Sequence, residues 1–208
     1  MTAFRTAEIG VQIVALLALL PNFAALSQPV STPQTTVIIF ADRPLQPGEW
    51  TALSAALRTD LNTGDKELAP LDHQADFVRG DALRSGLEVR SAITVYLHGD
   101  CSLQPGGRRT AWGVPLGWVR RVDGRIEPFI HVDCTNIANV LAPQARFLGP
   151  EHRTDIMAGA VARVILHEWI HVATQNSGHA EEGIAKARFG VNDLIVDEPV
   201  FAGSGAGR

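Results

Sequence analysis

Cysteine is scarce in this sequence, where Cys101 and Cys134 are the only two. Nothing near either cysteine has the paired-ligand spacing of a zinc finger or ribbon, so the two do not indicate a structural zinc site. Positive charge is also limited, because 18 lysines and arginines are outnumbered by 22 aspartates and glutamates. With a formal net charge of −4 and no basic patch, the sequence gives no support for binding to nucleic acid or to acidic lipid.

Long apolar runs are rare as well, and the first lies near the N-terminus, where Arg5 precedes the apolar segment 9–20. Pro21 ends this segment and a small-residue cleavage site follows at 25–27, so residues 1–27 are predicted to be a secretory signal peptide. The segment is shorter than the roughly 20 apolar residues of a membrane span, although an uncleaved anchor remains an alternative. We therefore expect an exported protein, secreted or periplasmic, with no stable membrane insertion after signal removal.

Export also bears on the two cysteines, because disulfides persist in oxidising compartments. A Cys101–Cys134 disulfide is expected, with two free buried thiols as the alternative. Within the mature chain, residues 28–196 are expected to form one domain, and they are long enough for a core of their own. Residues 197–208 are rich in glycine and are expected to form a flexible tail.

The body of the chain contains both strand patterns and helix patterns, and we expect an α+β fold with a small twisted mixed sheet packed on helices. Residues 76–87 fit neither pattern clearly, and Pro128 restricts its strand to an edge or a bulge. The predicted strands are 36–40, 92–97, 116–121 and 125–133, the last two joined by an Asp-Gly turn, and the predicted helices are 46–61, 135–141 and a long helix that begins at Pro150.

The most informative motif is His167-Glu168-Trp169-Ile170-His171, an H-E-x-x-H pattern within an apolar run. Residues four apart on an α-helix project from the same side, so His167 and His171 can bind one metal ion. Glu168 lies beside them and can accept a proton from a water molecule without being a ligand. The alternative is a core helix whose histidines bond to backbone carbonyls and whose glutamate faces solvent.

A catalytic zinc site needs a third protein ligand. Residues 176–178 favour the end of the helix, with Gly178 in a left-handed conformation that reverses the chain. This reversal would bring His179 toward the metal, which makes it the preferred third ligand. Glu181 and Glu182 remain alternatives, since two histidines and one glutamate also bind zinc.

Residues 111–195 resemble the metzincin-type metallopeptidases, which follow H-E-x-x-H with a third histidine after a glycine turn. The usual pattern would place glycine at Thr174 and histidine at Ser177, and this sequence has neither. The chain is more similar to a set of short exported bacterial proteins, metzincin-like and largely uncharacterised, in which seven residues separate the second and third histidines. Here residues 172–178 form that spacer, and Ala185 stands where the set has the methionine of a Gly-Ile-Met turn.

The motif and the resemblance together predict an exported zinc-dependent endopeptidase with a zincin-like fold. Zn²⁺ would be held by His167, His171 and His179. Glu168 would act as the general base. The expected partner is a peptide or protein substrate, held along an edge strand for which residues 125–133 are the candidate. Two other classes stay open: a zinc-bound but catalytically silent exported binding protein, and a structural protein without metal.

The tyrosine and two further histidines are not assigned a role in catalysis. Tyr96 is the only tyrosine, and none follows His179, so no transition-state hydroxyl is assigned. His98 and His131 are expected to be surface or hydrogen-bonded residues, although the ends of strands often border a site.

Overall fold

The computed structural model describes residues 35–83, 89–106 and 114–195. The predicted signal peptide at 1–27 and the predicted tail at 197–208 lie outside the described residues. Helices and strands are both present, so the α+β class is confirmed. In chain order the elements are β1 (Thr35–Ala41), α1 (Pro47–Leu61), η1 (Lys66–Leu68), β2 (Asp76–Arg79), η2 (Gly80–Ala82), β3 (Ser91–His98), β4 (Gly117–Val122), β5 (Arg125–Asp133), α2 (Cys134–Ala145), α3 (Pro150–Thr174) and α4 (Val191–Leu194).

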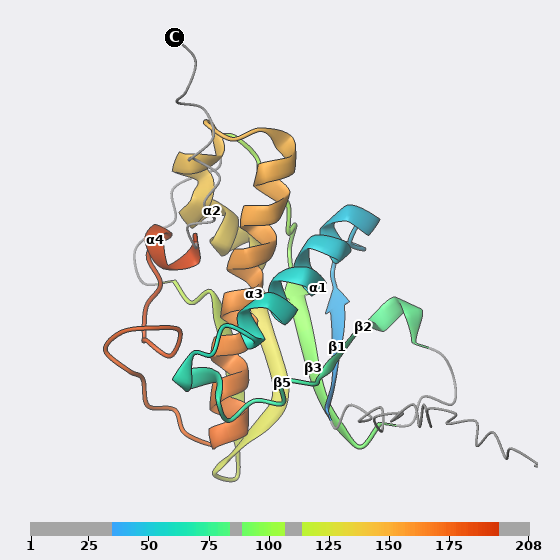
Figure 1. Ribbon diagram of the computed structural model, residues 1–208, viewed down its shortest axis with the longest axis vertical. Helices are drawn as coiled ribbons and strands as arrows, with labels where there is room; N and C mark the ends of the chain where they lie inside the picture. The colour runs from blue at the N-terminus through green and yellow to red at the C-terminus, as the bar shows by residue number, and fades with distance from the viewer. Residues whose placement is uncertain (1–34, 84–88, 107–113, 196–208) are drawn as a thin grey trace, which may run out of the picture. The chain divides into compact units, whose positions relative to one another are not determined.

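The described strands form one mixed sheet in the order β2-β1-β3-β5-β4 (Figure 1). β1 pairs in parallel with both β2 and β3, and β3 pairs in parallel with β5. Only β4 is antiparallel, as the second partner of β5. The connection between β1 and β2 contains α1, in keeping with the need of parallel neighbours for a crossover. The predicted mixed sheet is therefore present.

The predicted hairpin is confirmed, but the prediction that residues 125–133 form an edge strand is wrong. These residues are β5, which lies between β3 and β4, so the edge strand on this side is β4. Pro128 is tolerated in an inner strand because the pairing with β3 begins only at Phe129. On the other side the register with β4 shifts between Val119 and Arg121, which is the bulge that the proline also allowed.

One face of the sheet is covered by α1 and α3, which lie side by side (Figure 1). Side chains along a strand alternate between the two faces. Val95 and Val132 point to the covered face and are fully buried. Tyr96 and His131 alternate with them and therefore lie on the opposite face of the sheet.

The N-terminal residues of α1 and its apolar face explain why the helix forms where the sequence predicts it. Pro47 occupies the first helical position, and the Glu49 carboxylate accepts a hydrogen bond from the backbone N–H of Gln46 at 2.8 Å. Leu53 and Leu57, four residues apart, are buried against the core. Helix and sheet are thus joined by a continuous apolar layer.

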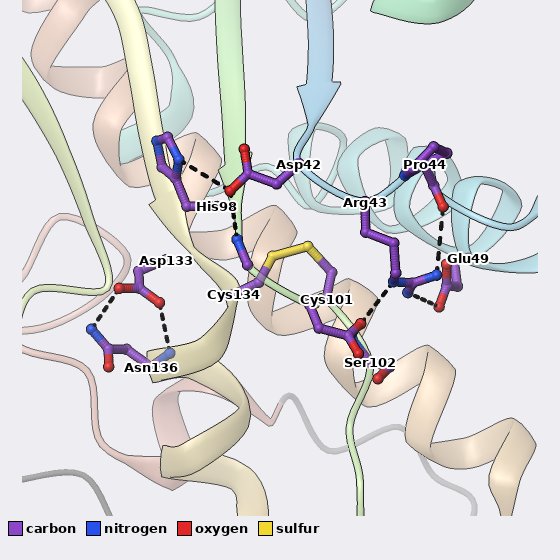
Figure 2. Close-up of a disulfide and its surroundings, with 12 residues drawn as sticks. Asp42, Arg43, Pro44, Glu49, His98, Cys101, Ser102, Asp133, Cys134 and Asn136 are labelled. Carbon is purple, nitrogen blue, oxygen red and sulfur yellow. Dashed lines mark hydrogen bonds and ion pairs between the residues drawn. A yellow bond between two sulfur atoms is a disulfide. The ribbon is translucent and has the colours of Figure 1, made fainter.

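The second helix is longer than the predicted 135–141 and covers Cys134–Ala145. Asp133 caps its start by accepting a hydrogen bond from the backbone N–H of Asn136 at 2.8 Å. The expected disulfide between Cys101 and Cys134 is present, with an S–S distance of 2.01 Å. Figure 2 shows that it joins the loop after β3 to the first turn of α2.

The long predicted helix is α3, and it begins at Pro150 as expected. By length and composition alone, α3 is long and apolar enough to cross a membrane. However, most of its apolar part is buried inside the protein, as in a core helix. Its buried residues include His167, Glu168 and His171, three of the four buried polar or charged residues of the described chain.

Candidate metal centre

The H-E-x-x-H residues lie on the buried side of α3, near its C-terminal end. His167, Glu168 and His171 are each 6% exposed. Burying three such groups in an apolar layer is costly unless each has a partner. The contacts of the two imidazole rings show which partners the fold supplies.

Each helix histidine bonds to a backbone carbonyl through Nδ1. His167 Nδ1 lies 2.7 Å from the carbonyl oxygen of Ile184, and His171 Nδ1 lies 2.6 Å from that of Asn176. A carbonyl oxygen only accepts, so both Nδ1 atoms carry the proton and donate it. In the neutral rings both Nε2 atoms are therefore left with free lone pairs.

These two lone pairs face each other. His167 Nε2 and His171 Nε2 are 3.1 Å apart, and the rings are nearly perpendicular. Two unprotonated nitrogens cannot bond to each other, whereas a cation between them satisfies both. Nitrogens that bind one zinc ion at about 2.0–2.1 Å in a tetrahedral site lie roughly 3.3 Å apart. The observed spacing fits such an ion.

His179 completes the group. One nitrogen from each of His167, His171 and His179 lies within 4.8 Å of the others, close enough to hold a metal ion. His179 is exposed, unlike the other two histidines. Glu181 and Glu182, the alternatives left open by the sequence, do not belong to this group, so the chain reversal brings His179 to the pair.

The reversal itself differs from the prediction at Gly178. The left-handed residue is Gln175, with φ 55° and ψ 23°, and Gly178 does not have a positive φ. The Gln175 side chain compensates by pairing with β5: its oxygen accepts from Ile126 N–H at 2.9 Å, and its amide donates to Ile126 O at 3.0 Å. These bonds stabilise a conformation that a residue with a Cβ seldom adopts.

Glu168 has the environment of a proton carrier. Burial raises its pKa from 4.5 to about 7. Burial also lowers the pKa of His167 to about 4, so that ring stays neutral near pH 7. The alternative of a solvent-facing glutamate is therefore wrong, although the carbonyl bonds that it implied for the histidines do exist.

Two further residues at the site were missed from the sequence. Glu67 in η1 accepts a hydrogen bond from Ala185 N–H at 2.7 Å, next to the Ile184 carbonyl that binds His167. Gly117 in β4 faces Glu168, since a Cβ there would lie 3.1 Å from the Glu168 carboxylate. A glycine within a strand pattern often marks such a close approach, so Gly117 carried a signal in the sequence. Glu67 carried none.

His98 and His131 are not part of this centre. They lie on the face of the sheet opposite α1 and α3, with His98 Nε2 3.0 Å from His131 Nδ1. The His131 ring stacks between Tyr96 and Trp118. They are hydrogen-bonded surface residues, as the sequence predicted.

The chain was compared with known proteins at the level of families, sequences and structures. No protein-family model, curated protein or solved structure matches it. The geometry of the three histidines and of Glu168 therefore has to carry the functional argument.

Proposed function

We propose that this protein is an exported, zinc-dependent endopeptidase with a zincin-like arrangement of its α+β fold. The observation that carries the proposal is the pair of facing Nε2 lone pairs, 3.1 Å apart, with a third imidazole within reach and a buried carboxyl group in the next helical position. Three imidazoles would form a donor set suited to Zn²⁺, and they would leave a position open for water or substrate. When bound, the ion supplies a Lewis acid that polarises a carbonyl group and acidifies a water molecule.

Glu168 is the proton carrier in this proposal. Its carboxylate accepts the proton of the attacking water and later delivers it to the leaving amine. A group does both jobs best when its pKa is near the working pH, and burial raises the pKa of Glu168 to about 7.

The substrate would lie along β4, in place of the strand that the sequence suggested. β4 is an edge of the described sheet and therefore has backbone groups available to an extended peptide. Gly117 is the first residue of this strand. Because it has no side chain, its backbone lies close to Glu168. A peptide paired with β4 would thus pass close to the proton carrier.

The location proposed for this reaction is outside the cytoplasm. Residues 1–27 have the sequence pattern of a secretory signal. The Cys101–Cys134 disulfide agrees with an oxidising compartment.

The test combines metal analysis with one isosteric substitution. Purified protein would be assayed for bound zinc and for cleavage of a peptide mixture, as wild type and as Glu168→Gln. Retained zinc with lost cleavage supports the proposal, and unchanged cleavage removes Glu168 from the mechanism. Glu151→Gln, at an exposed position in the first turn of the same helix, is the matched control and leaves cleavage unchanged.

A second candidate is a zinc-bound exported binding protein without catalysis. It is favoured by Ala185, which replaces the methionine of the related turn pattern. This candidate predicts stoichiometric zinc in the wild type, no cleavage of any peptide in the mixture, and no effect of Glu168→Gln on partner binding.

A further inference from the structure

A cavity separate from the three histidines lies between α1 and the N-terminal half of α3. Its volume is about 400 Å³, within the range of small-molecule sites. None of the residues that line it belongs to the candidate metal centre. It is independent of the proposed peptidase site in both position and lining.

The topology of the sheet explains why a cavity forms here. Its lining includes Leu45, in the loop after β1, and Leu97, near the end of β3, so it lies at the carboxyl ends of these two parallel strands. The connection from β1 leads to β2 on one side, whereas β3 is followed by β4 on the other side of the sheet. Where neighbouring connections diverge in this way, open sheets with parallel strands leave a ligand-binding crevice.

The wall of the cavity contains an unpaired cation. Arg153 lines the cavity, and its Nε is buried without a hydrogen-bond partner. In the described part of the chain its guanidinium also has no ion pair. A buried guanidinium donor without an acceptor is costly, so the fold leaves Arg153 ready for an anionic group.

The one carboxylate in the lining does not serve as that group. Glu49 Oε1 pairs with Arg43 Nη2 at 2.6 Å, and Oε2 accepts the backbone N–H of Gln46 at 2.8 Å. Its oxygens are thus already engaged on the side of α1. Among the described residues, Arg153 is therefore the charged side chain of the lining that has no ion pair.

The other walls are mainly aliphatic. Leu53 of α1 and Met157 and Val161 of α3 contribute buried side chains, and Ala158 adds a small one. A ligand that matches this lining has one anionic end for Arg153 and an apolar body for the remainder. Inorganic anions match only the first part.

The walls are fixed in place by covalent and ionic contacts (Figure 2). Arg43 bridges Glu49 at the start of α1 and Asp100 in the loop after β3, at 2.6 and 2.9 Å. The disulfide of Cys101 holds the same loop against α2. A cavity with braced walls loses little conformational entropy when a ligand binds.

We propose that this cavity binds a small carboxylic acid with an aliphatic chain. The carboxylate pairs with Arg153, and the chain lies against Leu53, Met157 and Val161. A guanidinium and a carboxylate form two parallel charge-assisted hydrogen bonds, which gives the site its preference for a carboxylate over a neutral head group.

The proposal is tested by calorimetric titration of the wild type, with and without added zinc, with decanoate, decanol and acetate. We expect decanoate to bind with a stoichiometry of one to one. Decanol lacks the carboxylate and acetate lacks the aliphatic chain, so both should bind at least about ten-fold more weakly. Arg153→Gln is expected to weaken decanoate binding by about ten-fold or more. Arg146→Gln, at an exposed position outside the cavity, is the matched control and keeps the wild-type affinity.

A second variant locates the binding in the cavity. Ala158→Leu fills part of the cavity and keeps the charge of Arg153, so it too is expected to weaken decanoate binding. A carboxylate bound at zinc would be insensitive to both Arg153→Gln and Ala158→Leu, and that result would overturn the proposal. So would the absence of decanoate binding at millimolar concentration. Neither result affects the peptidase test, which depends on Glu168.

Discussion

The carboxylate of Glu67 accepts a hydrogen bond from the backbone N–H of Ala185 at 2.7 Å, across 118 residues of sequence. The preceding carbonyl, that of Ile184, accepts the Nδ1 proton of His167. Gly183, with φ +76°, completes the contact, because a Cβ there would lie 2.6 Å from Glu67. Glu67 thus positions the turn that fixes the tautomer and orientation of His167.

We expect Glu67→Ala to weaken zinc binding by about 10-fold, the low end of the cost of losing a direct hydrogen-bond partner of a metal ligand, because Glu67 acts on His167 only through the turn at 184–185. Without the carboxylate, the turn at Ala185 is free to shift and His167 loses its fixed orientation. Competition with a chromogenic chelator measures the affinity. Lys66→Ala, at an exposed neighbouring position, serves as control, and equal affinities of the two variants would contradict the role of Glu67.

The identity of the third ligand gives a second prediction. His179→Ala removes one of three nitrogens and is expected to reduce zinc affinity by several orders of magnitude, whereas Glu181→Gln and Glu182→Gln leave it unchanged. The reason is geometric, since only the histidine lies with His167 and His171 in one group. A loss of zinc in either glutamine variant would restore the corresponding glutamate as a ligand.

Gly117 gives a third prediction, because an added methyl group at this position has no space. Its Cβ would lie 2.6 Å from Val164 Cγ1 and 3.1 Å from Glu168 Oε1. We expect Gly117→Ala to cost about 1–3 kcal/mol of unfolding free energy. We also expect it to lower peptide cleavage about ten-fold or more by displacing Glu168, with zinc retained.

Gly159→Ala is the matched control for this effect. Gly159 lies on α3, and a Cβ there would have no atom within 4 Å. Alanine in a helix is favoured over glycine by roughly 0.5–1 kcal/mol, so this variant should be more stable than the wild type. If Gly117→Ala proved equally benign, the close packing of β4 on Glu168 would be disproved.

Local features of this fold were predictable from the sequence. The spacing of His167 and His171 requires only helical geometry, and the Asp-Gly turn at 123–124 requires only local backbone preference. The disulfide followed from the presence of two cysteines and an expected export signal. In each case the deciding interactions lie within a few residues or depend on composition.

The predictions that were wrong and the residues that were missed involve contacts between distant segments of the chain. β5 is an inner strand because it pairs with β3, and no property of residues 125–133 alone specifies that partner. Gln175 replaces Gly178 as the left-handed residue because its side chain bonds to Ile126, 49 positions away. Glu67 reaches Ala185 over a still longer separation. Such pairings become visible only when the chain is folded.

The disulfide gives a fourth prediction, this time for stability. The bond closes a loop of 33 residues, which restricts the unfolded chain by an amount equivalent to about 3–4 kcal/mol. We expect the double variant Cys101→Ala, Cys134→Ala to lose about that much unfolding free energy in denaturant titrations. Thiol titration of the denatured, unreduced wild type is the control, and detection of two free thiols would contradict the bond.

The face of the sheet opposite α1 and α3 gives a fifth prediction, for the dependence of stability on pH. Burial, His98 and Arg120 together lower the pKa of His131 below its ordinary value of 6.5. As the pH falls through 6.5, the unfolded chain therefore takes up a proton at this position before the folded protein does. The free energy of unfolding must decrease in this range, and it decreases until the pH passes the lower pKa of the folded state.

His131→Phe isolates this contribution, because a phenyl ring can keep the stacking between Tyr96 and Trp118 but cannot bind a proton. We expect the stability of the wild type relative to the variant to decline as the pH falls through 6.5, the range in which only the unfolded chain takes up the proton. The measurement is the difference in melting temperature at each pH, in which acid-induced loss of metal cancels because both proteins keep the same three histidines. A difference that stays constant with pH would show that folding does not change the proton affinity of His131.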